Sequence, residues 1–239
     1  MVLAAGRGER MRPLTDHCPK PLLAVRGKPL MQYHLEALGR AGLRELVVNT
    51  AWLGSQIENR FGPLCAWDGH GTLSNQEQML RIRYSDEGRD FGGALETAGG
   101  IARALPLLDD AFWLVGGDVF IPRFTFERAA LERFAASGKL AHLFLVPNPE
   151  HNPKGDFGLR PDGVALNTKE GTRYTYSTIG LYRQALFGSL PHGNPQGIKA
   201  PLAPLLRAAM DRGEVSAEIY TGPWTDVGTP ERLAQLQVE

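Results

Sequence analysis

The hydrophobic positions of this chain alternate between runs typical of buried strands and the 3.6-residue spacing of amphipathic helices. Between residues 29 and 41 the apolar side chains fall on one side of a helix, and Gly42 follows its end. An uninterrupted apolar run such as that at 45–50 instead predicts a short buried strand. These patterns predict helices over 29–41, 55–61, 97–105 and 126–136, and strands over 2–5, 45–50, 80–85, 112–115 and 142–146.

The second half of the chain changes character. It contains a hairpin-like turn at 160–163 within 157–166, and strands over 174–182 and 217–220. A clear amphipathic helix covers 201–212, and Thr229 with Pro230 begins a last helix as N-cap and first residue. No linker composition interrupts the chain. We therefore expect one α/β domain over residues 1–239, a Rossmann-like, mostly parallel sheet flanked by helices with a small antiparallel insertion.

Composition narrows the function classes. Lys and Arg number 26 and Asp and Glu also 26, so the chain lacks the basic excess of a nucleic-acid or anionic-membrane binder. Glycine makes up about 12% of the residues against a usual value of about 7%, which suits many tight loops at a ligand site. Cys18 and Cys65 lack metal-type spacing and are predicted to be reduced thiols. Without a signal peptide or a long apolar run, we expect a cytoplasmic protein.

The loop after the first predicted strand concentrates phosphate-binding chemistry. It carries Gly6 and Gly8, three arginines and, shortly after them, Lys20. Small residues let backbone N–H groups approach phosphate oxygens, and fixed cations neutralise their charge. The loop lacks the Gly-Lys-Ser/Thr of a P-loop, and Met11 stands where the dinucleotide fingerprint needs a third glycine. The pattern therefore predicts a polyphosphate site of another kind.

Residues 3–15 and the Pro-Lys-Pro at 19–21 resemble the signature of the sugar-1-phosphate nucleotidyltransferases. Later landmarks of that family follow in order at 95–100, 116–118, 155–157 and 224–230, so the resemblance covers essentially the whole chain. Gly-Glu-Arg-Met-Arg, Gly-Asp-Phe and the lack of a further domain look most like the bacterial N-acetylmuramate-1-phosphate uridylyltransferases. The resemblance implies the nucleotide-diphospho-sugar transferase fold, with a nucleotide-binding half over about 1–120 and a sugar-phosphate-binding half over about 121–239.

The implied reaction is Mg²⁺-dependent transfer of a uridylyl group from UTP to N-acetylmuramate 1-phosphate, which yields UDP-N-acetylmuramate and pyrophosphate for cell-wall recycling. Two anions must meet, and at an effective dielectric of about 20 two unit charges about 4 Å apart repel by roughly 4 kcal/mol. Arg12 and Lys20 are expected to offset that charge at the triphosphate. Asp118 and Asp226 are expected to hold Mg²⁺, because both fall within family motifs; either one taken alone would be interpreted as an independent turn or cap residue.

The remaining contacts are carried over from the family motifs. Arg7 and Arg10 could equally be solvated surface arginines, and Glu170 could equally be a plain turn residue. Thr97 is predicted to cap the helix that follows it, and Thr178 shares the strand of Ser177, where sugar contact and sheet packing are equal alternatives. The expected nucleotide contacts are Ala5, Gly6, Arg7, Gly8, Glu9, Arg10, Glu96 and Gly99, and the expected sugar-phosphate contacts are Gly116, Gly155, Glu170 and Ser177.

Three departures from the family pattern stand out. Gly116 replaces the asparagine usual before Gly117 and Asp118, only two residues precede Leu3 in the first strand, and the segment 62–80 is long and polar enough for a lid or an interface. The alternatives are another pairing, such as mannose 1-phosphate with GTP or glucose 1-phosphate with UTP or dTTP, and a nucleotide-sugar binding protein with decayed catalysis. No hexapeptide repeat indicates a fused β-helix. We expect a monomer or small homo-oligomer.

Overall fold

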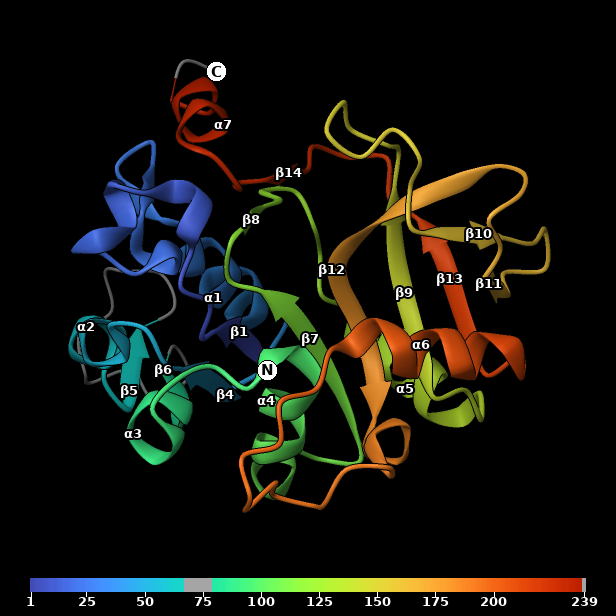
Figure 1. The fold of residues 1–239 in the computed structure, drawn as a ribbon, viewed down its shortest axis with the longest axis horizontal. Helices are drawn as coiled ribbons and strands as arrows, with labels where there is room; N and C mark the ends of the chain where they lie inside the picture. Colours follow the sequence, from blue (N-terminus) through green and yellow to red (C-terminus); the bar gives the residue numbers. More distant parts are fainter. Residues whose placement is uncertain (67–78, 238–239) are drawn as a thin grey trace.

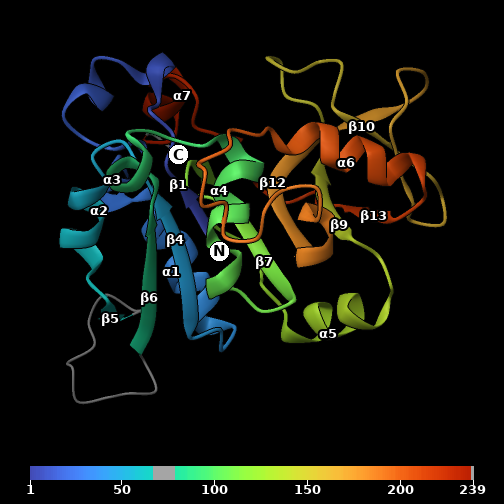
Figure 2. The same cartoon turned by 60° about the horizontal axis from the view of Figure 1, so that its bottom comes forward.

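The computed structural model describes residues 1–66 and 79–237, and within them ten strands form one mixed sheet (Figures 1 and 2). The strand order is β11-β10-β12-β7-β1-β4-β6-β5, with β9 also paired to β12 and β13 paired to β9. The strands are β1 (Val2–Ala4), β4 (Glu45–Thr50), β5 (Leu64–Ala66), β6 (Met79–Asp86), β7 (Ala111–Gly116), β9 (Ala141–Val146), β10 (Phe157–Leu159), β11 (Ala165–Leu166), β12 (Arg173–Arg183) and β13 (Val215–Ile219).

Besides the large sheet, the described residues form two strand pairs, seven α-helices and five 3₁₀ helices of three or four residues. The pairs are β2 (Ala24–Val25) with β3 (Lys28–Pro29), and β8 (Val119–Phe120) with β14 (Thr225–Asp226). The helices are α1 (Leu30–Arg40), α2 (Gly54–Phe61), α3 (Glu87–Phe91), α4 (Glu96–Ala104), α5 (Arg128–Ala136), α6 (Leu202–Asp211) and α7 (Pro230–Gln235).

Strands β7, β1, β4 and β6 run parallel, so their carboxyl ends meet at one edge of the sheet. The long strand β12 runs antiparallel to β7 and to β9 and joins this parallel half to the β9–β13 half. Ligands of open α/β sheets bind beyond the carboxyl ends of the strands. The topology therefore brings the loops after β1 and β7 together, although they lie more than a hundred residues apart in the chain.

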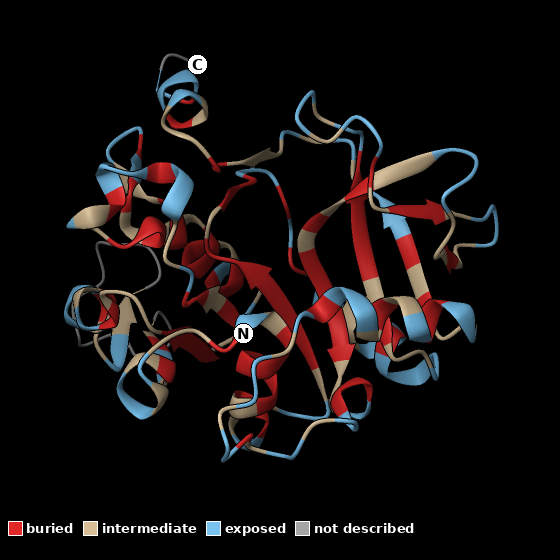
Figure 3. Cartoon of the chain, in the orientation of Figure 1, coloured by how far each residue is buried: buried red, intermediate tan, exposed pale blue. Residues whose placement is uncertain are grey.

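The alternation of side chains divides the buried residues between the two faces of the sheet. In β7, Phe112 and Leu114 join the core under α4 and α6, whereas Trp113 and Val115 join the core under α1 and α5. The strands are accordingly buried along most of their length, and the helices expose their outer sides (Figure 3). A third, smaller cluster packs Met11, Val227 and Leu233 between the first loop and α7. It anchors the glycine- and arginine-rich loop to the C-terminal segment.

The predicted fold class is confirmed. The strand over 45–50 has its predicted bounds, and the other predicted helices and strands agree to within two residues at their ends. The prediction that Thr97 caps its helix is wrong, because α4 begins at Glu96 after Leu95, with Thr97 inside its first turn. The first strand is held on both sides, by β4 and β7. Of the long segment 62–80, Leu64–Ala66 forms β5 against β6, and 67–78 lies outside the described residues.

Sequence patterns missed the short elements. Helix α3 begins after Asp86, whose carboxylate accepts a hydrogen bond from the Arg89 N–H, and the β2–β3 hairpin turns through Arg26 and Gly27. Each of these is only a few residues long, too short for a hydrophobic period to appear. None of the helices in 1–66 and 79–237 combines the length and apolar character needed to cross a bilayer.

Candidate active site

Three adjoining cavities open at the carboxyl edge of the parallel strands. The N-loop cavity, about 280 Å³, lies between the loop after β1 and the start of α4; Ala5, Gly6, Lys20 and Glu96 line it. The α6 cavity, about 550 Å³, lies between α4, β12 and α6. The aspartate cavity, about 310 Å³, contains both predicted metal ligands, Asp118 and Asp226. They share wall residues, and Thr178 lines all three, so they form one composite site.

The N-terminal loop holds its cations in different ways. The Arg7 guanidinium lies 3.8 Å from the centre of the Trp52 ring and donates to the Thr15 carbonyl and, at 2.9 Å, to the Asp16 carboxylate. Arg12 also donates to Asp16, at 2.8 Å, and its side chain is 59% exposed. Hydrogen bonds from these two arginines, that of Arg7 first, hold the pKa of Asp16 below its ordinary value. Asp16 thus holds both arginines, and neither of them is among the described residues that line the three cavities, whereas Arg10 lines the aspartate cavity.

Lys20 and Asp118 form the central ion pair of the site. The Lys20 ammonium lies 2.6 Å from Asp118 Oδ2, and the lysine is 8% exposed. Lys20 comes from the turn after Pro19, and Asp118 from the turn between β7 and β8. A nearly buried ammonium is costly unless an anion faces it. The pair therefore places a fixed positive charge in the wall of the N-loop cavity, beside a carboxylate that also reaches the aspartate cavity.

The two aspartates come together through β8 and β14. Asp226 faces Val119 across this antiparallel pair, and the Val227 N–H donates to the Asp118 carbonyl at 3.1 Å. Asp226 Oδ2 accepts a hydrogen bond from Arg232 at 2.8 Å. No group of three or more His, Cys, Asp or Glu side chains suited to a metal occurs among residues 1–66 and 79–237. A metal here would therefore be held by two carboxylates and completed by oxygens from substrate and water.

Asn49 and Glu87 form a buried polar network in the wall of the N-loop cavity. Asn49 Oδ1 accepts from the Ala4 N–H at 2.9 Å, and its amide group donates to Glu87 Oε1 at 2.6 Å. The other Glu87 oxygen accepts from the Leu95 N–H at 2.7 Å, and the Glu87 side chain is wholly buried. Burial raises the pKa of Glu87 against the pull of these bonds. The network fixes the two backbone segments that face each other across the cavity.

A family model described as nucleotidyl transferase matches residues 1–160, two thirds of the chain. The chain belongs to the nucleotidyl transferase family. Members of this family generally use a divalent metal ion. The predicted family and enzyme class are therefore confirmed.

Two relatives match this chain over nearly its whole length and nearly the whole of their own. The N-acetylmuramate α-1-phosphate uridylyltransferase of Neisseria meningitidis is 46% identical over 99% of this chain and 96% of its own. That of Caulobacter vibrioides is 31% identical over 100% of this chain and 94% of its own. A Bacillus anthracis structure assigned as a glucose-1-phosphate thymidylyltransferase superposes with a TM-score of 0.74 at 18% identity, covering 99% of this chain and 92% of that one. It shares the fold.

Three of the eight predicted nucleotide contacts line the N-loop cavity. Ala5, Gly6 and Glu96 line it, and Gly8 adopts the left-handed conformation, φ +68°, that turns the loop. Glu9 is exposed and lies 3.7 Å from Arg7. Gly99 is not brought to the cavity: its N–H donates to the Ala200 carbonyl, and a Cβ there would lie 2.4 Å from the Ile198 carbonyl oxygen. Close packing of α4 on the 198–200 segment accounts for that glycine.

The predicted sugar-phosphate contacts are brought together less completely. Gly116 lines the N-loop cavity. Ser177 is buried, and its hydroxyl accepts from the Ile179 N–H; its neighbour Thr178 is the one that lines the cavities. Glu170 is exposed in the loop between β11 and β12, where it lines none of the three. Gly155 makes a turn at φ +62° beside Asp156, which does line two of them.

Several site residues escaped sequence reasoning. Asn49 stands in an apolar strand and Glu87 in an acidic stretch typical of a surface loop, so neither pattern indicates a buried hydrogen-bonded pair. Asp156 lies within the Gly-Asp-Phe motif, so attention to the whole motif would have found it. Arg207 follows the exposed period of α6 and nevertheless lines the α6 cavity. Its position at the cavity depends on how α6 lies relative to β12, which the sequence pattern does not indicate.

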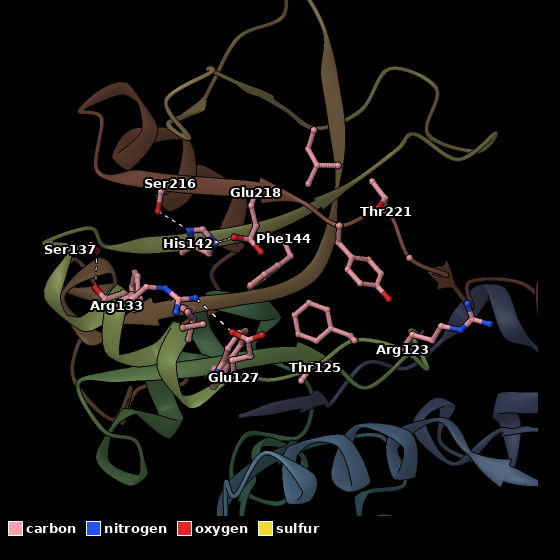
Figure 4. A pocket seen from close by; sticks show the side chains of 18 residues that line it. Arg123, Thr125, Glu127, Arg133, Ser137, His142, Phe144, Ser216, Glu218 and Thr221 are labelled. Carbon is pink, nitrogen blue, oxygen red and sulfur yellow. Dashed lines mark hydrogen bonds and ion pairs between the residues drawn. The ribbon is translucent and has the colours of Figure 1, made fainter.

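A further cavity of about 470 Å³ lies among α5, β9 and β13, on the sheet face opposite α4 and α6 (Figure 4). His142 Nδ1 lies 2.9 Å from the Ser216 hydroxyl, and its Nε2 lies 3.5 Å from Glu218. Hydrogen bonding to His142 lowers the pKa of Glu218. These polar groups come from the neighbouring strands β9 and β13 and pair with one another on one wall of the cavity. It shares no residue with the composite site.

Proposed function

We propose that this chain transfers a uridylyl group from UTP to N-acetylmuramate α-1-phosphate and releases pyrophosphate, as a step of cell-wall recycling. The observation that carries the proposal is the 46% identity that extends over 99% of this chain to the Neisseria meningitidis uridylyltransferase. A relationship over that length includes both the N-loop cavity and the α6 cavity. UTP and sugar phosphates are intracellular metabolites, so we place the activity in the cytoplasm.

The α6 cavity suits a sugar that carries a carboxylate. N-acetylmuramate differs from N-acetylglucosamine by a lactyl ether whose carboxylate is ionised at neutral pH. Arg207 lines the cavity, donates to the Asn167 side-chain oxygen at 3.1 Å and lies 5.6 Å from the centre of the Phe157 ring. A guanidinium placed over an aromatic ring recognises carboxylates well. Leu114, Leu202 and Leu206 give the cavity apolar walls. Arg207 is the one cationic side chain among the described residues that line it, together with the carboxylates of Glu96 and Asp156.

Asp118 and Asp226 fit a Mg²⁺ ion. Carboxylate oxygens are the ligands that Mg²⁺ prefers, and it usually takes one or two from the protein and the rest from phosphate and water. Both aspartates line the aspartate cavity, and the Asp118 side chain is 39% exposed toward it. When bound, the ion would supply positive charge at the α-phosphate. Arg232 orients Asp226, and Lys20 orients Asp118.

The protein residues have little covalent chemistry to perform, because the attacking phosphate is already ionised. Backbone N–H groups of the Gly6–Gly8 turn are suited to triphosphate oxygens. Lys20 supplies a fixed cation where negative charge accumulates, and the Asn49–Glu87 network keeps Ala4 and Leu95 in place around it. Binding the two anions side by side in the correct orientation is the main contribution we assign to the protein.

The test is a matrix of nucleoside triphosphates against sugar 1-phosphates, scored by pyrophosphate release. UTP with N-acetylmuramate α-1-phosphate should give the highest kcat/KM, above UTP with N-acetylglucosamine 1-phosphate. A better pair, such as GTP with mannose 1-phosphate, would refute the assigned substrates. In the same assay, Asp226→Asn should abolish Mg²⁺-dependent turnover; Glu231→Asn, nearby in α7, is the matched control and should retain it. Undiminished turnover of Asp226→Asn would refute the metal role.

A further inference from the structure

Gly116 has no room for a side chain. A Cβ built on it would lie 2.6 Å from the Thr178 hydroxyl oxygen and 3.0 Å from Asp118 Oδ1. Real Cβ atoms do not approach other heavy atoms as closely as the first of these distances. The glycine at the end of β7 is therefore required by Thr178, which reaches across from β12, more than sixty residues later in the chain.

Thr178 occupies this place at a conformational cost. Its φ is +64°, in the left-handed region that β-branched residues rarely adopt. The pairing of β12 with β9 shifts between Tyr176 and Gly180, and this irregularity interrupts the alternation of the strand. Ser177 and Ile179 are fully buried on either side, while Thr178 lines the cavities. Strained backbone of this kind is concentrated at ligand sites.

The Thr178 hydroxyl shows a second unfavourable feature. Its oxygen is buried and has no hydrogen-bond partner within the described part of the chain. Buried hydroxyls are almost always paired, because an unpaired one loses its bonds to water without compensation. Two unfavourable features thus coincide at one residue, and that residue lies where the N-loop, α6 and aspartate cavities meet. A ligand group at this junction would satisfy the hydroxyl.

We infer that the Thr178 hydroxyl donates a hydrogen bond to a phosphate oxygen of the sugar 1-phosphate, and that Gly116 is the space that admits it. This inference rests on the proposed function, in which the sugar fills the α6 cavity and the triphosphate fills the N-loop cavity. The phosphate that joins them must lie at their junction. Asp118 Oδ1 borders the same space and is already balanced by the Lys20 ammonium, so the neutral Thr178 hydroxyl can add a hydrogen bond to the phosphate without adding charge.

The first test compares Thr178→Val with Thr178→Ser. Valine keeps the branched shape and the backbone cost but lacks the hydroxyl, whereas serine keeps the hydroxyl. Thr178→Val should lower kcat/KM for the sugar 1-phosphate by about tenfold or more, as expected for a lost hydrogen bond to a charged group, with an unchanged KM for UTP. Its Tm should be no lower than that of the wild type, because valine leaves no unpaired hydroxyl at this buried position. Thr178→Ser should retain most activity. Wild-type kcat/KM in Thr178→Val would overturn the inference. If the valine variant does not fold, Thr178→Ala takes its place as the variant without a hydroxyl and is compared with Thr178→Ser.

The second test separates function from packing. Thr178→Gly relieves the left-handed strain and should raise Tm while lowering activity as much as Thr178→Val does. Gly116→Ala should lower both Tm and activity, and adding Thr178→Gly should restore Tm without restoring activity. Recovered activity in the double variant would refute a role for the hydroxyl. All variants are assayed on the best substrate pair of the wild type. The substrate matrix on the wild type therefore tests the proposed substrates, and the comparison among variants tests the role of the hydroxyl separately.

Discussion

The buried Asn49–Glu87 contact can be tested by one isosteric change. Asn49→Asp leaves the Oδ1 that accepts from Ala4 but replaces the amide donor by a second carboxylate oxygen, 2.6 Å from Glu87 Oε1. Two unit charges at that distance repel by about 6 kcal/mol at an effective dielectric of about 20. At pH 7 a carboxyl with the ordinary glutamate pKa of 4.5 takes up a proton for only about 3 kcal/mol. The variant will therefore bind a proton when it folds.

This proton sets both the size and the pH dependence of the effect. At pH 7 Asn49→Asp should be destabilised by about 3 kcal/mol, or roughly 6 to 12 °C in Tm. Because the folded variant holds a proton that the unfolded chain has released, its stability relative to wild type should fall by about 1.4 kcal/mol per pH unit between pH 5 and 7. Displacement of Ala4 and Leu95 should also raise KM for UTP.

The assay is urea denaturation of wild type and variant from pH 5 to 7.5, with pyrophosphate release measured in parallel. Asn59→Asp, on the exposed surface of α2, is the matched control and should change stability by less than about 0.5 kcal/mol at every pH. If Asn49→Asp is as stable as wild type at pH 7 and shows no dependence of this difference on pH, then Glu87 is not an ionised carboxylate bonded to the Asn49 amide, and the prediction is refuted.

Local patterns predict this fold well because most of its helices bury one continuous stripe of apolar side chains and most of its strands bury one continuous apolar run. The helix over 201–212 and the strand over 45–50 have clear periods, and Gly42 and Gly213 do follow helix ends in the left-handed conformation. His34, within the predicted helix over 29–41, is buried, and its Nε2 lies 2.9 Å from the Val119 carbonyl oxygen. Each of these features depends on residues that are neighbours in sequence.

The site is only partly predictable, because its geometry depends on residues that meet across the sheet. The motifs place Lys20, Asp118 and Asp226 in one region, but no spacing indicates that Arg7 and Arg12 both donate to Asp16. Nor does strand alternation decide between Ser177 and Thr178, since the register shift in β12 breaks the alternation at that point. The physical reason for Gly116 in place of the usual asparagine is that Thr178 fills the space that a side chain would need, and no sequence pattern indicates that contact.

Two further predictions concern buried positions near the site. Burial lowers the pKa of His34 to about 4 from 6.5, so the unfolded chain alone binds a proton between these values and stability should fall by about 3 kcal/mol as the pH drops through them; His34→Gln, whose amide can still donate to the Val119 carbonyl, should flatten that slope in urea denaturation from pH 4 to 7. Gly99→Ala would place a methyl group 2.4 Å from the Ile198 carbonyl oxygen and 3.1 Å from the Ala200 nitrogen, both backbone atoms that cannot rotate away. It should cost about 1 to 3 kcal/mol by overpacking, whereas Gly213→Ala, with open space around it but φ +71°, should cost about 1 kcal/mol through its backbone alone. If Gly99→Ala raises KM for UTP while Tm is unchanged, Gly99 contacts the nucleotide directly and the packing explanation is wrong.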